Sequence, residues 1–556
     1  MGLPPSVHVG QGLPVLALAN VARNAALVVL ALGAATTRAD QSAFASFEQE
    51  GMIVGEIRIE ARNIFDLDDP HENGPLFRLA NRLHAQTHEE VIRRLLLFKP
   101  GDRISLRVIE ETERIMRANR FLYDVKIAPA GVHDGIVDID VVTRDTWSLD
   151  LTGRFGRAGG SNTTAFGILE HNFLGSGVQL GLSQVSDVDR HGTQALASYG
   201  QAFDGWTALH VEADRYSDGD RSIASVMRPF YSLDTRWAAG ASWDRWNRVD
   251  SIYNAGDVTA KYRHRSELGE ISAGWSPGLV GGWTQRLSVG ALVQDHTYGL
   301  EPGQAAPSPL PIDHQVRGPF VRAEIIEDRY VKLRNRDQIA RPEFFEMGFA
   351  SQLQITRSTG AWGASRSAWF YSFSVSRGFT LPRDQDLIAS ATLQRQAAST
   401  GLPLTQLGGV MRYFAPQGSH NAFYASASAD RLSEGAAAPD QLQIGGDNGL
   451  RGYPLRYQNG DRRALITLEE RAYTDWYPFR LARVGGAVFY DRGRAWGGVN
   501  QNTLNGGWLS DVGVGLRLAL DRAAFGNVLH ADIAVPLQRA EGIRSVQFIV
   551  KTQITF

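Results

Sequence analysis

The stretch Asp511–Leu520, DVGVGLRLAL, alternates between two kinds of residue along its whole length. Valine or leucine occupies every second position, and aspartate, glycine, arginine and alanine stand between them. Successive side chains of a β-strand point to opposite faces, so this period of two predicts a strand with one apolar face. Arg517 and, in the next segment, Asp532 lie on the other face, where charged side chains argue against a dry core.

The alternation recurs in segments 529–537 and 546–556 and dominates the chain from Trp147 onward. Many segments of about ten residues, each with one apolar and one polar face, are typical of a transmembrane β-barrel with a polar lumen. A soluble β-sandwich or propeller is the alternative. The pattern alone predicts roughly 16 to 20 strands, and an even number if both ends of the barrel lie on one side of the membrane.

The bulk properties exclude several function classes. The chain has 556 residues, a net charge of −2 and no cysteine. A near-neutral balance offers no basic surface for nucleic acid, and without cysteine there are no disulfides and no thiol chemistry. His88 in HEEVI lacks the second histidine of a zinc motif, and no P-loop or nucleophile elbow is present. We therefore predict no catalytic residue, no metal, no cofactor and no enzymatic activity, with a lumenal histidine or carboxylate constellation as the open alternative.

Residues 1–39 are predicted to be a secretory signal peptide. The apolar segment Ala25–Ala35 follows Arg23, ends in small residues and is too short to span a bilayer, and cleavage after Ala39 fits the pattern. The region before Arg23 is long for a signal peptide, so we expect the true start near Val21. A buried helix is the alternative interpretation.

Residues 51–145 differ from the rest and predict a small α+β domain. GMIVGEIRIEA alternates as a strand, Thr87 and Glu90 have the spacing of a capping box before a first helix, and a second helix follows. Two further strands are then predicted around a turn at 133–135. The remaining residues, 146–556, form the predicted barrel.

The loop Ile444–Leu455, IGGDNGLRGYPL, places a single arginine, Arg451, among turn-forming residues. Alternation in the strands that follow points Glu469 and Asp491 into the lumen. Arginine can pair with carboxylates in a bidentate way, and the glycines let the backbone approach the wall closely. We therefore predict that the loop folds into the lumen and that Arg451 binds these carboxylates.

The segments GGDNGLRGY, LEER and VFYDRGRAW, in this order, resemble the barrel signature of the BamA/TamA superfamily of outer-membrane assembly and translocation proteins. The arginine-glycine-aromatic motif of that family is matched by Arg451, Gly452 and Tyr453, and its carboxylate partners by Glu469 and Asp491. The segments LLLFKPGDRIS and ERIMRANRFLYDVKI resemble a polypeptide-transport-associated (POTRA) domain. This chain has room for one such domain, whereas characterised insertases carry several, and residues 66–86 look like an insertion in it.

The resemblance implies a mainly β protein, with one POTRA domain before a 16-stranded antiparallel transmembrane barrel. It also implies a weak seam between the first and last strands, 147–157 and 546–556, where glycine weakens pairing and exposed edges attract other strands. The predicted seam residues are Gly153, Gly156, Phe548 and Phe556.

The implied location is the bacterial outer membrane, with the POTRA domain in the periplasm. The implied function is to assist the insertion or translocation of client proteins through the seam. Outer-membrane lipids, unfolded outer-membrane or secreted clients and a periplasmic partner at the POTRA domain are the expected partners. The alternatives are a lipid-handling or envelope-structural member of the superfamily, and a plain porin.

Overall fold

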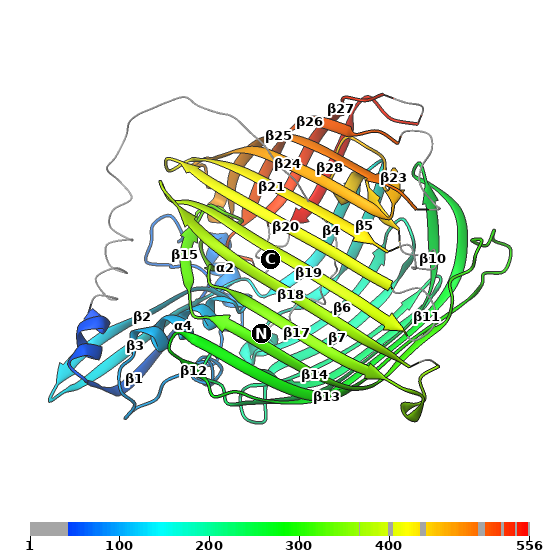
Figure 1. Ribbon diagram of the computed structural model, residues 1–556. Coiled ribbons are helices and arrows are strands. Elements are labelled where there is room, and N and C mark those ends of the chain that lie inside the picture. The colour runs from blue at the N-terminus through cyan, green and yellow to red at the C-terminus, as the bar shows by residue number, and fades with distance from the viewer. Residues whose placement is uncertain are drawn as a thin grey trace.

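The computed structural model describes residues 43–365, 367–398, 404–433, 441–498, 506–523, 528–539 and 542–553. The predicted signal peptide and Phe556 lie outside these ranges. Figure 1 shows a large barrel with a small domain, drawn in blue, at one end. We call this end of the barrel the proximal end and the opposite one the distal end. No helix among the described residues has the length and apolar character needed to cross a bilayer.

The small domain contains a three-stranded sheet covered by helices. Its core is built from apolar side chains of the three strands and of two of the helices, including Ile92, Met116 and Ile139, which are buried. The sheet order is β1-β3-β2, with β1 parallel and β2 antiparallel to β3. The elements are β1 (Ile53–Arg62), α2 (Pro75–Leu83), α3 (Glu89–Arg93), α4 (Leu106–Arg117), β2 (Leu122–His133) and β3 (Ile136–Asp145).

The structure confirms the predicted strands around the turn at 133–135 but corrects the start of the first helix. Thr87 does not cap α3; its hydroxyl donates to Asp145 at 2.9 Å and accepts from Asn172 at 2.8 Å. Asn172 belongs to the barrel, so a residue with capping-box spacing instead joins the domain to the barrel. The segment 66–86 contains the additional helix α2.

The barrel is closed and antiparallel, and its wall has 20 strands, not the 16 that the family resemblance implied. Alternation locates strands but cannot fix how many close the barrel, and the resemblance transferred a number that this chain does not share. The even number returns β28 to the proximal end, where β4 begins. The wall strands are β4 (Leu149–Ala158), β5 (Ser161–Glu170), β6 (Val178–Ser186), β7 (His191–Ala202), β8 (Thr207–Tyr216), β9 (Gly219–Arg228), β10 (Trp237–Asn254), β11 (Asp257–Trp275), β13 (Trp283–Leu300), β14 (His314–Glu327), β17 (Ala350–Ser358), β18 (Ala368–Leu381), β19 (Gln385–Ala398), β20 (Leu404–Gln417), β21 (Asn421–Leu432), β24 (Arg462–Tyr473), β25 (Ala482–Trp496), β26 (Leu509–Leu520), β27 (Val528–Pro536) and β28 (Gln547–Gln553).

Short elements occupy the connections. The pair β12 (Leu279–Val280) extends the turn before β13, whereas β15 (Tyr330–Arg334) with β16 (Pro342–Glu346) and β22 (Leu442–Ile444) with β23 (Gln458–Gly460) form separate two-stranded sheets. Single 3-10 turns are η1 (Phe173–Gly175), η2 (Gly360–Trp362), η3 (Gly446–Asn448) and η4 (Pro478–Arg480).

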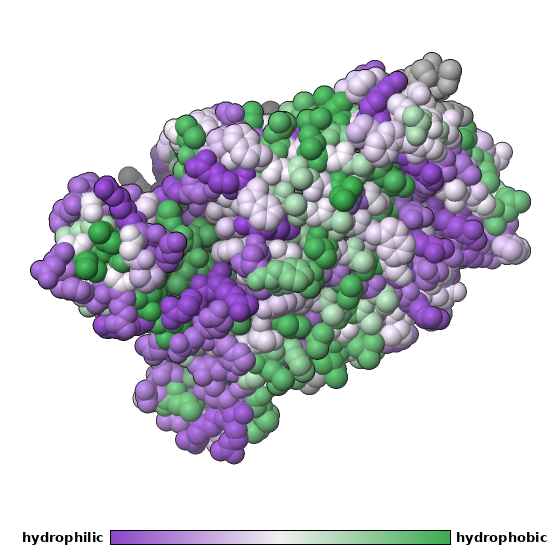
Figure 2. All heavy atoms as spheres, turned by 90° about the horizontal axis from the view of Figure 1, so that it is seen from below, coloured by the Kyte–Doolittle hydropathy of each residue, from purple (hydrophilic) through white to green (hydrophobic). Residues whose placement is uncertain are grey.

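The wall has the two faces that the alternation predicts. In β26, Val512, Val514 and Leu516 are exposed on the outside, while Asp511 and Arg517 are buried inside. Figure 2 shows one side of the molecule, where green and white residues cover most of the middle and purple residues gather towards both ends. An apolar outer band between polar ends is the surface expected of a membrane-spanning barrel.

Candidate functional site in the barrel lumen

The first and last described strands of the barrel, β4 and β28, meet at a seam. Neighbouring strands pair along most of their length: β4 is in register with β5 from Leu149 to Ala158, and β27 with β28 from Val528 to Ala534. Between β28 and β4, the pairing found among the described residues is the single pair Val550–Arg157. Within the part of the chain that the structure describes, the register between these two strands thus rests on one pair.

The predicted seam residues lie on these strands where the structure describes them. Gly156 in β4 faces the seam closely, since a Cβ there would lie 3.4 Å from the carbonyl oxygen of Val550. Phe548 in β28 points outward and is exposed. Gly153 lies within β4, one of the two seam strands, and Phe556 lies outside the described residues.

The loop between β22 and β23 folds into the lumen, where Leu450 and Tyr453 are fully buried. Gly449 adopts a positive φ of 107°, which glycine tolerates best, and a Cβ there would collide with Leu465. Gly452 lies so close to the wall that a Cβ would be 2.7 Å from the Cβ of Asp511. The glycines allow the backbone to pass where side chains would not fit.

Arg451 lies against both carboxylates that the sequence analysis paired with it. Its Nε and Nη2 donate to the two oxygens of Asp491 at 2.7 and 3.0 Å, and its Nη1 donates to Glu469 at 2.8 Å. Nη1 also donates to Asp532 at 3.1 Å, and the guanidinium lies 3.4 Å from the centre of the Phe489 ring. The guanidinium is thus held by strands β24, β25 and β27 at once.

Two further arginines complete this cluster. Arg471 donates to Glu469 at 2.8 Å, while Arg517 contacts Glu469 at 3.4 Å and pairs with Asp532. Positive and negative groups balance, and each member is buried, so the loss of one would leave others uncompensated. We call the following residues the latch cluster: Arg451, Arg471, Arg517, Glu469, Asp491 and Asp532.

Sequence reasoning did not assign Asp532, Arg471 and Arg517 to Arg451. Alternation had already placed all of them on the lumenal face, which was the available signal. It could not show that residues 81 positions apart, such as Arg451 and Asp532, meet across the lumen.

Tyr453, the third residue of the motif, fixes the same loop to the next part of the wall. Its hydroxyl lies 2.9 Å from the backbone oxygen of Ser510 and accepts from the backbone amide of Gln538 at 3.3 Å. The loop is thereby attached to β26 and to the segment after β27.

The distal part of the loop reaches the other side of the seam. The amide of Leu455 points to the carbonyl of Gly159 at 3.4 Å, in the turn that joins β4 and β5. Arg456 donates to both oxygens of Asp189 at 2.9 and 2.6 Å, in the connection between β6 and β7. One loop therefore contacts the wall on both sides of the seam between β28 and β4.

Comparisons with solved structures find matches at low sequence identity. BamA from Haemophilus ducreyi lacking POTRA domains 1–3 matches over 90% of this chain and 84% of that one, with 14% identity and a TM-score of 0.37. CdiB from Escherichia coli matches over 90% and 76% with 12% identity and a TM-score of 0.46, and CdiB from Acinetobacter baumannii over 90% and 73% with 13% and 0.41. No protein-family model and no curated relative matches the chain.

A second insert enters the lumen from the proximal end. The connection between β14 and β17 forms the hairpin β15–β16, and its tip packs Ile339 against Tyr473 and Ala519 of the wall. Arg336 donates to Asp386 at 3.0 and 2.7 Å and, through its carbonyl oxygen, accepts from Arg471 at 2.7 Å. This hairpin is not among the elements that the sequence pattern predicts.

The same hairpin contacts the small domain. Lys332 pairs with Glu113 at 2.8 Å, Arg114 stacks over the Tyr330 ring at 3.6 Å, and Arg341 donates to the Leu122 carbonyl at 3.1 Å. In Figure 1, β15 lies at the end of the barrel beside the blue domain. A chain of polar contacts thus runs from α4, through the hairpin and Arg471, to Glu469 of the latch cluster.

No group of three or more histidine, aspartate or glutamate side chains suited to a metal ion occurs in the described ranges. The six residues of the latch cluster are arginines and carboxylates that pair with one another, and serine, threonine and cysteine nucleophiles are not among them.

Proposed function

We propose that this chain is a bacterial outer-membrane barrel that assists client proteins in entering or crossing the membrane at the β28–β4 seam, with residues 51–145 acting as a periplasmic POTRA domain. The observation that carries this proposal is the seam itself, paired through Val550–Arg157 and bridged by the Arg451 loop. A weakly paired edge can accept a client strand by backbone hydrogen bonding.

In this mechanism the loop keeps the seam closed while the latch cluster is intact. A client strand pairs with β4 or β28 through backbone hydrogen bonds and leaves sideways into lipid. Client folding and lipid burial supply the free energy, so the proposal requires no catalytic residue and no cofactor. The domain's sheet edge offers an earlier docking strand by the same chemistry.

The alternatives make different demands. A plain porin needs an open lumen, whereas here a loop and a hairpin both occupy it. A lipid-handling or envelope-structural role remains the competing proposal. Depletion of the protein separates the two proposals. The lipid-handling role predicts an altered lipid distribution with an unchanged outer-membrane proteome, whereas client assembly predicts a changed proteome.

A disulfide across the seam tests the proposal directly. The chain has no cysteine, so Arg157→Cys with Val550→Cys introduces a single possible bond. Residues paired across antiparallel strands lie about 4.5–5.5 Å apart at Cα, within disulfide range. The matched control, Val514→Cys with Ile533→Cys, crosslinks two fully paired strands.

Oxidation of the seam pair is expected to stop client assembly, and reduction is expected to restore it, while the control pair has no effect in either state. Full client assembly by the oxidised seam variant would refute the lateral mechanism.

A further inference from the structure

Helix α2 presents an apolar stripe away from its own domain. Leu76, Leu79 and Leu83 share one side of the helix and are 75%, 48% and 67% exposed. The opposite side is anchored: Phe77 packs on Phe65 at a ring distance of 4.6 Å, and Asn81 bonds the backbone of Phe65 at 3.0 and 2.8 Å. The leucines therefore face outward because the inner contacts fix the orientation of the helix.

Two arginines flank this stripe. Arg78 and Arg82 are one helical turn apart, exposed, and neighbours of the leucines on the helix surface. A helix with an exposed leucine side bordered by basic residues is typical of helices that lie in a membrane interface, with arginine close to lipid phosphates.

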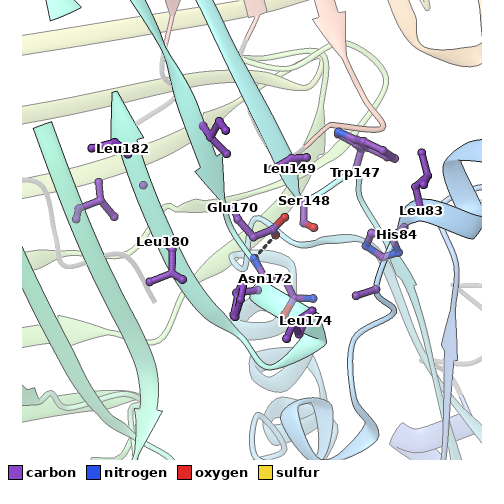
Figure 3. Close-up of a pocket in the computed structure, with 15 residues that line it drawn as sticks. Leu83, His84, Trp147, Ser148, Leu149, Glu170, Asn172, Leu174, Leu180 and Leu182 are labelled. Atoms are coloured by element: carbon purple, nitrogen blue, oxygen red, sulfur yellow. Dashed lines mark hydrogen bonds between the residues drawn. The ribbon is translucent and has the colours of Figure 1, made fainter. Parts of the chain in front are cut away.

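The C-terminal end of α2 borders a pocket of about 800 Å³ against the outer wall of the barrel. In Figure 3, His84, Ser148 and Asn172 lie towards the domain, whereas Leu180 and Leu182 lie towards the barrel wall. Most of the lining surface is apolar. The pocket is therefore a mainly apolar cavity between the domain and the barrel wall, and Arg78 and Arg82 of α2 lie outside its lining.

The apolar lining continues into the outer band of the barrel. Ile168 and Leu182 line the pocket and are 56% and 59% exposed, and Phe166, the next outward residue of β5, is 64% exposed. The site lies next to the seam, because Leu149 of β4 also lines it. The backbone here is already used: β5 pairs with β4 and β6 beside the pocket, so it offers no free edge for a client strand.

We propose that this pocket binds one phospholipid of the leaflet around the proximal end, with an acyl chain between Leu83, Leu174 and Leu182 and the phosphate towards Arg78 and Arg82. The lipid would join the small domain to the membrane beside the seam. The inference rests on the proposed position of the barrel in a membrane, and it is independent of which client the seam serves.

Trp147 lines the pocket and provides the test, because brominated acyl chains quench tryptophan on contact. The full chain in detergent is titrated with a phosphatidylglycerol that carries brominated acyl chains. The fluorescence of the Trp147→Phe variant is subtracted so that the difference reports Trp147 alone. We expect saturable quenching at one lipid per protein.

Two double variants change exposed side chains of the proposed lipid site. Leu83→Gln with Leu174→Gln removes apolar lining, and Arg78→Gln with Arg82→Gln removes the phosphate partners. Each is expected to weaken binding by about tenfold or more, given the usual contributions of a buried leucine or a basic residue at a lipid surface. The control, Leu353→Gln with Leu407→Gln, alters exposed leucines on β17 and β20 and should leave the titration unchanged.

Non-saturable quenching, or equal titrations for all variants, would overturn the lipid site. A signal displaced by an apolar peptide but not by unlabelled lipid would also overturn it. Liposomes of the same brominated lipid give the separate readout on the proposed function, through the outward Trp237 and Trp275. If these are quenched while the Trp147 titration is flat, only the lipid site fails; if they are not quenched, the membrane position fails.

Discussion

Glu469 is shared by Arg451 and Arg471: one carboxylate oxygen accepts from Arg451 at 2.8 Å, and the other from Arg471 at 2.8 Å. Arg451 belongs to the loop that bridges the seam, and Arg471 contacts the proximal hairpin through the carbonyl of Arg336. One buried carboxylate therefore joins the two inserts that enter the lumen, the Arg451 loop and the β15–β16 hairpin.

Arg451→Ala should release the loop while the barrel remains closed elsewhere. Removing one member of a buried ion cluster typically costs about 3–5 kcal/mol, because the partner charges stay desolvated. We expect faster hydrogen exchange over 445–457 and loss of client assembly. Arg462→Ala is the control, since the Arg462 side chain is 41% exposed and its pair with Asp461 is long, at 3.7 Å. Full activity of Arg451→Ala would contradict the latch role.

Gly452→Ala tests the close approach of the loop to the wall. The added methyl group would lie 2.7 Å from the Cβ of Asp511, so the loop must shift before it can fit. We expect Arg451 to lose its bidentate geometry, seen as increased protease cleavage within the loop. Gly507→Ala, where no atom lies within 4 Å of the added group, should behave as wild type. Equal protease resistance of both variants would argue against tight packing at Gly452.

Arg336→Ala should loosen the proximal hairpin and, through Arg471, the latch cluster. Asp386 is buried and would lose the guanidinium that pairs with it. In planar bilayers we expect higher single-channel conductance, because the hairpin no longer holds the proximal part of the lumen. Arg334→Ala, on the exposed side of the same hairpin, is the matched control. Unchanged conductance together with unchanged hydrogen exchange over 330–346 would show that this pair does not hold the hairpin.

The contact between the domain and the barrel should have a pH dependence that His84 masks. Burial raises the pKa of Asp145 to about 7 and lowers the pKa of His84 to about 4. In the unfolded chain the pKa is about 3.9 for Asp145 and about 6.5 for His84. Between these values the folded state holds an extra proton on Asp145, so stability falls as pH rises. The folded state also lacks a proton that the unfolded state holds on His84, so the contribution of His84 to stability rises with pH. The contributions of Asp145 and His84 therefore offset each other.

His84→Asn removes the histidine contribution and leaves that of Asp145. Local stability around Thr87, measured by hydrogen exchange of the full chain, should then fall between about pH 4 and 7, by up to about 1.4 kcal/mol per pH unit. The wild type should vary little over the same range. A variant whose stability rises with pH would mean that Asp145 is ionised in the folded protein.

The sequence by itself determined which side of each strand faces the lumen. Alternation is a local property of the chain, so it placed Glu469, Asp491, Arg517 and Asp532 on the inner face without any knowledge of the barrel. The residue types then predicted the partners of Arg451, because a lone arginine in a glycine-rich loop needs carboxylates if it is buried. Periodicity also predicted the three strands of the small domain and the two helices α3 and α4, but not helix α2.

Only the tertiary structure decided the number of strands, the contacts of Arg471 and the positions of the hairpin β15–β16 and helix α2. Closure of the barrel sets which inward side chains face one another, and that depends on the strand number and register together, not on any single segment. Asp532 therefore reaches Arg451 although 81 residues separate them, and Thr87, with the spacing of a helix cap, instead bonds the barrel at Asn172. Local patterns assign a side chain to a face, whereas its partner is selected by the closed wall.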